Sequence, residues 1–273
     1  MPDDALREVV AHYQAVEEDV RLGTGVFQLE FVRTKELILR HLPPAPTAIV
    51  DAGGGSGSYA FWLAELGHQV HLLDPVPKHI EQAKRRLTSG CAAPLAGVTL
   101  GDARELPFDD GSQGAVLLLG PLYHLTERNE RLACLGEARR VLRTGGLVFA
   151  AAISRFASLL AALHEDLINR DDFVPIIERD LRDGQHRNDT GNPEYFTTAF
   201  FHRPSELTEE IVESGLKLLD LLPVEGPGWL ASNFEQVWAS EKQRQRLLAL
   251  VRQVENKPEL LGASAHLIAI AQK

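Results

Sequence analysis

The chain has 273 residues, of which 44% are hydrophobic and 24% are charged, and its formal net charge is −10. This length suits one large domain or a domain with an added lid, and the composition excludes a disordered or fibrous protein. The acidic balance disfavours nucleic acids and anionic membrane surfaces, because both require clustered basic side chains. We therefore expect no nucleic-acid partner and no membrane partner, and no feature of the sequence indicates an oligomeric state.

The two cysteines, Cys91 and Cys134, lie far apart in the sequence, which excludes a disulfide framework and a cysteine-rich zinc site. We expect two reduced thiols in a cytoplasmic protein. Residues 1–10 are acidic and lack the apolar stretch of a signal peptide, and no apolar run is long enough to cross a membrane. The histidines do not share metal-ligand spacing with nearby acids, so we expect no metal.

The hydrophobic pattern predicts two N-terminal helices, which end at the proline cluster of residues 43–46. A regular alternation of strands and helices follows. This alternation is typical of a mostly parallel sheet with helices on both faces. Helices are predicted at 4–20, 26–41, 58–66, 78–88 and 126–142, and strands at 48–51, 70–74, 98–100, 115–119 and 147–153.

The alternation stops between residues 154 and 203, a stretch that resembles an inserted segment more than a part of the sheet. Its pattern predicts two helices, and a polar run at 182–193 precedes an aromatic segment. The alternation then resumes, which indicates that the chain returns to the sheet. The predicted elements of the insertion and the C-terminal part are helices at 156–169, 173–182, 204–214 and 233–254 and strands at 216–222 and 265–271.

A glycine-rich turn follows the first predicted strand, with the sequence VDAGGGSG at residues 50–57. Glycines let the backbone turn tightly and approach a ligand closely, and the helix that follows presents unpaired N–H groups. Asp74 ends the next strand, 19 residues after Gly55. A carboxylate at that position can accept hydrogen bonds from both hydroxyls of a ribose. Together, these features predict a site for a nucleoside-bearing cofactor.

Two classes of cofactor fit the glycine turn. Residues 55–60, GSGSYA, satisfy the alanine variant of the dinucleotide fingerprint, so a nicotinamide- or flavin-dependent oxidoreductase is an alternative. Three features favour another class. The glycine cluster begins two residues too early, at Gly53, a second acid follows the third strand at Asp102, and residues 138–146, ARRVLRTGG, lead from a helix into the fifth strand.

The sequence resembles the class I S-adenosylmethionine-dependent methyltransferases that act on small molecules. The resemblance rests on residues 50–57, Asp74, residues 101–108 and residues 142–147. It implies S-adenosylmethionine as the cofactor and a Rossmann-like, doubly wound α/β sheet of seven strands, the last one antiparallel. The expected parts are an N-terminal helical lid at 1–46, the cofactor-binding half at 47–153, a helical insertion that forms the acceptor lid at 154–203, and the C-terminal part of the sheet at 204–273.

The resemblance implies cofactor contacts at the ends of the first four strands. The glycine turn would pass under the methionine and ribose, Asp74 would hold the ribose hydroxyls, and Asp102 would accept a hydrogen bond from the adenine amino group. Arg33 is a candidate partner of the cofactor carboxylate, with a solvated arginine as the alternative, and Tyr13 either closes over the cofactor or only packs. The predicted cofactor-binding residues are Tyr13, Arg33, Asp51, Gly53, Gly55, Gly57, Asp74, Pro75, Asp102, Ala103, Leu119 and Gly120.

His124 follows the fourth strand, where the family places its reacting centre. Its ordinary pKa of about 6.5 suits a base at neutral pH, and the alternative interpretation is a wall of the methionine pocket. The predicted acceptor-site residues are Tyr123, Tyr195, His202 and Trp229, and we expect Tyr195 and His202 to face the cofactor cleft. The predicted function is methyl transfer to a small organic acceptor by in-line displacement. The alternatives are a nicotinamide-dependent oxidoreductase and a non-catalytic S-adenosylmethionine-binding protein.

Overall fold

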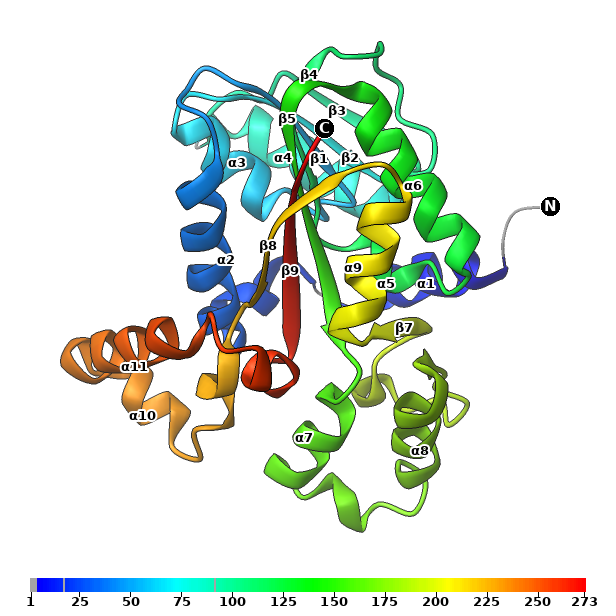
Figure 1. Ribbon diagram of the computed structural model, residues 1–273, viewed down its shortest axis with the longest axis vertical. Coiled ribbons are helices and arrows are strands. Elements are labelled where there is room, and N and C mark those ends of the chain that lie inside the picture. Colours follow the sequence, from blue (N-terminus) through cyan, green and yellow to red (C-terminus); the bar gives the residue numbers. More distant parts are fainter. Residues whose placement is uncertain (1–3, 17, 91) are drawn as a thin grey trace.

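The computed structural model describes residues 4–16, 18–90 and 92–273. Within these residues the main part of a sheet has seven strands in the order β3-β2-β1-β4-β5-β9-β8 (Figure 1). Two further short strands, β7 and β6, lie beside the end of β5. The seven strands are parallel except β9, which runs antiparallel to β5 and β8. The predicted seven-stranded, doubly wound fold with an antiparallel last strand is confirmed. The seven strands are β1 (Ala48–Ala52), β2 (Gln69–Asp74), β3 (Gly97–Leu100), β4 (Gln113–Leu118), β5 (Leu142–Ser154), β8 (Lys217–Pro223) and β9 (His266–Gln272).

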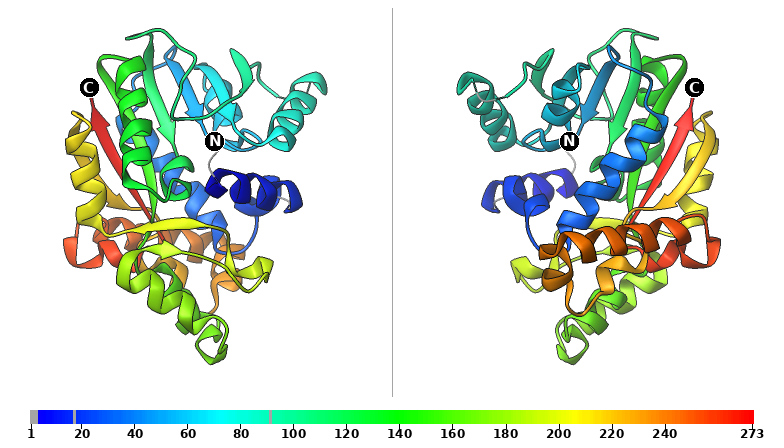
Figure 2. Two further views of the ribbon diagram at one scale, coloured as in Figure 1. Left: turned by 90° about the vertical axis from the view of Figure 1, so that its right-hand side faces the viewer. Right: turned by 90° about the vertical axis from the view of Figure 1, so that its left-hand side faces the viewer.

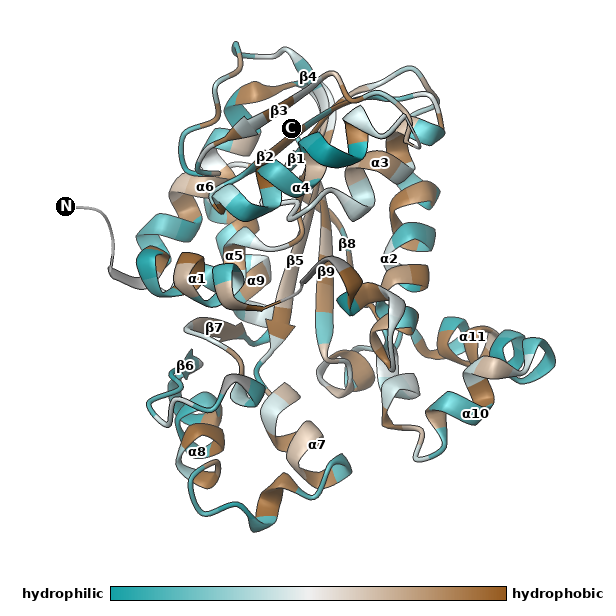
Figure 3. Ribbon diagram, turned by 180° about the vertical axis from the view of Figure 1, so that it is seen from behind, coloured by the Kyte–Doolittle hydropathy of each residue, from teal (hydrophilic) through white to brown (hydrophobic). Residues whose placement is uncertain are grey.

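Alternate residues of each central strand pack on opposite faces of the sheet. Val50 belongs to the apolar cluster under α6 (Arg128–Val141) and α9 (Pro204–Glu213). Its neighbour Ile49 belongs to the cluster under α2 (Phe27–His41), α3 (Ser58–Glu65) and α4 (Pro77–Thr88). The strands are therefore apolar on both sides, and hydrophobic colours predominate along β5 and β9 in Figure 3.

The carboxyl ends of the parallel strands lie at one edge of the sheet. The glycine turn follows β1 there, Asp74 ends β2, and α5 (Pro121–His124) follows β4. Because β9 runs in the opposite direction, it begins at this same edge, where His266 pairs with Ile153 near the end of β5. Loops from four strands thus converge on a shared space, the usual place for a ligand in such folds.

The insertion at residues 154–203 contains the predicted helices and also two short strands that we did not predict. Strand β7 (Ala199–His202) runs parallel to the end of β5, in register from Ile153 with Phe201, and β6 (Gln185–His186) pairs with β7. β4 pairs with β5 only as far as Ala150, and β7 pairs with the same edge of β5 beyond that point. The insertion also contains α7 (Ala157–His164), η2 (Leu167–Asn169), α8 (Val174–Asp183) and η3 (Pro193–Tyr195).

The N-terminal segment crosses the carboxyl edge of the sheet. In Figure 2, α1 (Asp4–Ala15) lies between α4 and the insertion. The Thr198 hydroxyl donates to Glu8 over 2.6 Å, and the Lys78 ammonium donates to the Val16 carbonyl over 2.7 Å. These contacts join α1 to both the cofactor half and the insertion. The short helix η1 (Glu18–Gly23) leads from α1 to α2.

The C-terminal helices differ in detail from the prediction. The single helix expected at 233–254 is two helices, α10 (Phe234–Ala239) and α11 (Glu241–Val254), which meet at Ser240. Both pack against Leu29 of α2 through an aromatic cluster that includes Trp238. Short helices η4 (Gly226–Leu230) and η5 (Pro258–Ala263) flank them. No helix in the described residues has the length and apolar character needed to cross a membrane.

Only one of the two cysteines, Cys134, lies in the described residues. Cys134 is a free thiol on α6, and burial raises its pKa. A fully buried thiol of this kind is a packing residue and not a reactive one. Cys91 lies outside the described residues, so the prediction of a reduced thiol there stays a prediction.

His202 does not face the cofactor cleft, contrary to the prediction. It is fully buried, and its Nε2 lies 3.2 Å from Glu210 on α9. The same carboxylate accepts hydrogen bonds from Arg131 of α6, the shortest over 2.7 Å. Successive residues of a strand point to opposite faces, so His202 turns to the side of α6 and α9 while Phe201 turns to the other side.

Glu210→Ala removes the carboxylate shared by two buried basic side chains. We expect the variant to lose about 3–5 kcal/mol of unfolding free energy, because a buried arginine is left without its partner. Urea denaturation followed by circular dichroism measures this loss. The control is Glu213→Ala on the same helix, whose exposed ion pair with Arg128 should be dispensable. Equal denaturation midpoints for the two variants would contradict the expectation.

Candidate functional site

The glycine turn after β1 is shaped for a ligand. Gly53, Gly55 and Gly57 have φ values of +70°, +60° and +94°, a region that favours glycine. A Cβ at Gly53 would lie 2.7 Å from Pro121, so that position has no room for a side chain. A Cβ at Gly55 would meet no atom within 4 Å. The backbone at Gly55 therefore borders open space at the carboxyl edge.

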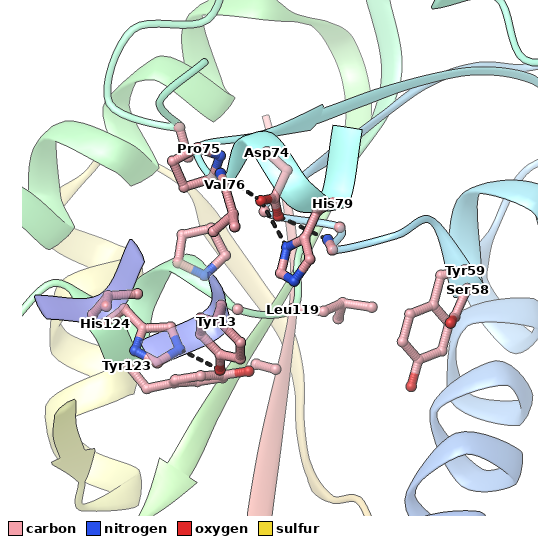
Figure 4. Close-up of a pocket in the computed structure, with 18 of the residues that line it drawn as sticks. Tyr13, Ser58, Tyr59, Asp74, Pro75, Val76, His79, Leu119, Tyr123 and His124 are labelled. Carbon is pink, nitrogen blue, oxygen red and sulfur yellow. Dashed lines mark hydrogen bonds and ion pairs between the residues drawn. The ribbon is translucent and has the colours of Figure 1, made fainter. Parts of the chain in front are cut away.

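Asp74 ties this turn to the next helix. Its Oδ2 accepts the Gly55 N–H over 2.8 Å, and its Oδ1 accepts the Val76 N–H over 2.9 Å (Figure 4). The buried His79 of α4 places Nδ1 3.0 Å from Oδ1, and because the carboxylate only accepts, that nitrogen carries a proton. His79 was not among the residues predicted from the sequence, although its place in the first turn of the helix after Asp74 was a usable signal.

Most of the predicted cofactor residues line one cavity at this edge, which we call the donor cavity. Asp102 is held there by Arg104, whose Nη2 donates to Oδ2 over 2.6 Å. Gly57 does not line the cavity but caps the start of α3 in a left-handed conformation. The predicted residues that line the donor cavity are Tyr13, Gly53, Gly55, Asp74, Pro75, Asp102, Ala103, Leu119 and Gly120.

Asp51 lies beneath the glycine turn and not in the donor cavity. A Cβ on Gly54 would lie 2.5 Å from its Oδ2, and the carboxylate is fully buried. Neither oxygen makes a hydrogen bond of normal geometry to any described residue, although the Ala60 amide is near enough to lower the pKa. Burial first, and then the negative charge of Asp74, raise the pKa of Asp51 to about 7. A buried carboxylate without a partner is suited to compensate a cationic group nearby.

Arg33 does not reach the donor cavity, so its predicted contact with the cofactor carboxylate is wrong. Its side chain is fully buried, donates to the Val224 carbonyl over 3.2 Å, and pairs with Glu36 and Glu255. These partners lie on the side of α2 that faces the C-terminal helices. The arginine that lines the donor cavity is Arg21 of η1, which the sequence analysis did not single out.

His124 lines the donor cavity beside α1. The Tyr13 hydroxyl and Nε2 are 2.9 Å apart (Figure 4). Nδ1 lies 3.4 Å from the Thr198 carbonyl. A carbonyl only accepts, so Nδ1 carries the proton and Nε2 accepts from the tyrosine. Burial lowers the pKa of His124 to about 4. Such a weak base does not suit the predicted role of proton acceptor, and the geometry favours the alternative, a wall of the pocket.

A second cavity lies between the carboxyl edge and the insertion, and we call it the acceptor cavity. Tyr195 lines this cavity and not the donor cavity, contrary to the prediction that it faces the cofactor. Its hydroxyl donates to Asp172 over 3.2 Å. Two other predicted acceptor-site residues, Tyr123 and Trp229, also line this cavity. Most of the wall is apolar or aromatic. The residues that line both cavities are Tyr13, Arg21, Tyr123 and His266, so the two spaces adjoin at these side chains.

Glu30, Glu225 and His266 are close enough together to hold a metal ion, with potential ligand atoms within 4.8 Å of one another in the described part of the chain. All three already have partners. Glu30 pairs with Arg21 at 2.7 Å, and Glu225 lies 2.6 Å from His266 Nδ1. A protonated imidazole between two carboxylates is not a metal ligand. We interpret the cluster as a set of ion pairs, and the expected lack of a metal stays a prediction.

Comparisons with known proteins place the chain among the methyltransferases. Residues 49–146 match the family model described as a methyltransferase domain. The chain is 33% identical over 105 residues to an uncharacterised methyltransferase of Mycobacterium tuberculosis, which covers 38% of this chain and 39% of that protein. It is 35% identical over 175 residues to a ubiquinone biosynthesis O-methyltransferase of Methylocella silvestris, with 56% and 66% covered. A geranyl diphosphate C-methyltransferase from Streptomyces coelicolor shares the fold, with a TM-score of 0.62, 12% identity, and 99% and 98% covered.

The chain belongs to the class I S-adenosylmethionine-dependent methyltransferases, so the predicted family, enzyme class and cofactor are confirmed. The matched part spans 39% of the first curated relatives, so their whole activity does not carry over by similarity alone. The fold also hosts many chemistries, and the acceptor has to be inferred from the site.

The buried Asp51 generates a pH-dependent prediction. Its pKa is about 7 in the folded protein and about 4 in an unfolded chain, so folding loses stability as the pH rises through this range. Asp51→Asn lacks this penalty, so the stability of the variant relative to the parent should be about 1–3 kcal/mol greater at pH 8 than at pH 5. Urea denaturation at both pH values tests this. The exposed Asp109→Asn should show no such difference, and an equal effect of Asp51→Asn at both values would contradict the assignment.

Proposed function

We propose that the protein transfers the methyl group of S-adenosylmethionine to a small organic acceptor. The main support for this proposal is a pair of adjoining cavities. The side chains that line both are Tyr13, Arg21, Tyr123 and His266. One cavity has the glycine turn and strand-end acids of a nucleoside site, and the other is mostly apolar. A methyl group at their junction is within reach of a molecule in the second cavity.

The donor cavity supplies a contact for each part of the cofactor. Asp74 suits the ribose hydroxyls because a carboxylate accepts from both, and Asp102, at the end of the next strand, suits the adenine amino group. The open backbone at Gly55 suits the methionine part. His79 Nε2, which has no hydrogen-bond partner among the described residues, offers one more polar atom in this cavity. The family match favours this cofactor over a nicotinamide dinucleotide.

The acceptor cavity favours an organic molecule with a ring or another broad apolar surface. Ile153, Ala157 and Ala161 are among its aliphatic lining residues. Pockets of this composition bind through apolar area, and a few polar groups fix the orientation of the ligand. The O-methyltransferase relative is named for ubiquinone biosynthesis, which agrees with such an acceptor. The aromatic residues in the lining are Tyr13, Phe27, Tyr123, Phe173, Tyr195, Phe196, Phe201 and Trp229.

The mechanism that suits this arrangement is positioning. S-adenosylmethionine supplies an activated methyl group on a sulfonium, and the residues of this chain have to hold the acceptor in line with it. Fixed orientation can lower a barrier by about 7–11 kcal/mol in the best intramolecular cases. The Tyr13–His124 and Glu8–Thr198 hydrogen bonds hold α1 over the donor cavity, which excludes water from the transfer.

Calorimetric titration with S-adenosylmethionine tests the donor cavity, and Gly55→Val is the informative variant. A side chain at Gly55 would project into the space assigned to the cofactor, so binding should become undetectable. Gly111→Val is the matched control. Gly111 has a similar φ of +68°, has no atom within 4 Å of its Cβ position, and lies outside the donor cavity. Retained affinity in Gly55→Val, or equal loss in both variants, would contradict the cofactor assignment.

Ala161→Trp tests the acceptor cavity. A large ring at this position of α7 should fill the cavity and reduce turnover at least tenfold, while S-adenosylmethionine affinity stays within about 0.5 kcal/mol. Turnover is followed as transfer of labelled methyl to a panel of phenols, thiols, amines and fractionated metabolites. Leu163→Trp, on the exposed side of the same helix, is the control and should keep full activity. Loss of cofactor affinity together with turnover would show that the two cavities do not have separate tasks.

A further inference from the structure

His266 is held in a fixed orientation at the junction of the two cavities. Its Nδ1 lies 2.6 Å from Oε1 of the buried Glu225. The other oxygen of Glu225 accepts the Ser264 hydroxyl over 2.7 Å and the His266 backbone N–H over 3.0 Å. Because a carboxylate only accepts, Nδ1 carries a proton, and Nε2 is the nitrogen that can exchange one. A carboxylate that orients an imidazole in this way is a recurring arrangement for general bases.

The charged groups around His266 come from three other segments. Glu30 of α2 places Oε2 4.0 Å from Nδ1, Glu225 precedes η4, and Arg21 of η1 pairs with Glu30 at 2.7 Å. Burial and Arg21 both lower the pKa of His266, but the two carboxylates outweigh them and raise it to about 9. A proton taken up by this imidazole is therefore well stabilised.

The other side chains shared by the two cavities are less suited to accept a proton. Arg21 stays protonated in proteins, and a tyrosine hydroxyl holds its proton until a pH of about 10. Tyr13 hydrogen-bonds to His124, whose own pKa of about 4 makes it a weak base. Among the described residues common to both cavities, His266 alone combines a fixed orientation with a ring nitrogen that can take up and release a proton.

We propose that His266 is the general base of the methyl transfer, that Glu225 is its positioning residue, and that the acceptor arrives protonated at a heteroatom, as a phenol, a thiol or an ammonium group. This inference rests on the proposed function. The Nε2 lone pair takes the proton of the acceptor, and the electron pair of the heteroatom forms the new bond to the methyl carbon. The carbon–sulfur bond breaks, and its electron pair stays on sulfur. The positive charge leaves the sulfonium and comes to rest on the imidazolium between Glu225 and Glu30.

The charge of the donor sets the protonation state of this base. A sulfonium in the donor cavity repels the imidazolium and favours loss of its proton, so His266 becomes a competent base when the donor is bound. S-adenosylhomocysteine, the product, has a neutral thioether and exerts no such repulsion. Binding of the donor should therefore release protons that binding of the product does not.

Calorimetry of the full chain at pH 8 measures this difference, with each of the two compounds titrated in buffers of different ionisation enthalpy. We expect S-adenosylmethionine to release about half a proton more than S-adenosylhomocysteine. His266→Gln should abolish the difference. Glu225→Gln should reduce the difference, because loss of one of the two carboxylates lowers the pKa of the imidazole and leaves less of it protonated at this pH. The control His41→Gln removes a histidine that also pairs with an acid, Asp220 at 3.3 Å, but lies outside both cavities, and it should keep the difference.

Equal proton release for the two compounds in the parent protein would overturn the inference, as would a difference that persists in folded His266→Gln protein or is undiminished in folded Glu225→Gln protein. The parent would still bind both compounds in that case, so the proposed function would stand. Failure of the parent to bind either compound would overturn the proposed function itself, and with it this inference.

Discussion

The carboxylate of Asp74 is the interaction on which the donor cavity depends. It accepts the backbone N–H of Gly55 and that of Val76, and it pairs with His79. These bonds fix the glycine turn after β1, the end of β2 and the start of α4 relative to one another. A ribose at Asp74 would thereby lie at a set distance from the open backbone at Gly55, and the rest of the proposed nucleoside site surrounds this connection.

The direction of β9 places a polar side chain at the junction of the two cavities. A parallel strand would end at the carboxyl edge, but the antiparallel β9 begins there, so His266 enters the space that the other strands leave for ligands. β8 ends at the same place and is followed by Glu225. The oriented imidazole is thus a consequence of sheet topology, and the insertion supplies the apolar surface opposite to it.

The cofactor half was predictable because its signals are local. Asp51, Asp74 and Asp102 each sit at or next to the end of a strand, and the turn between Gly53 and Gly57 uses a conformation that favours glycine. The misassigned residues depend on orientation. Hydrophobic periodicity places Arg33 on a helix but does not predict which elements that face of the helix packs against. Along β7, the adjacent residues Phe201 and His202 point to opposite faces, so Phe201 lines the acceptor cavity and His202 is buried away from it. The pair of Glu225 and His266 was not predictable because β8 and β9 must pair before these residues meet.

A crystal structure with S-adenosylhomocysteine would show whether the donor occupies the cavity at the carboxyl edge. We expect the ribose hydroxyls to bind Asp74, the adenine to lie between Pro75 and Asp102, and the thioether sulfur to face the junction beside His266. A ligand bound elsewhere, or bound in this cavity with its ribose away from Asp74, would rule out this donor site.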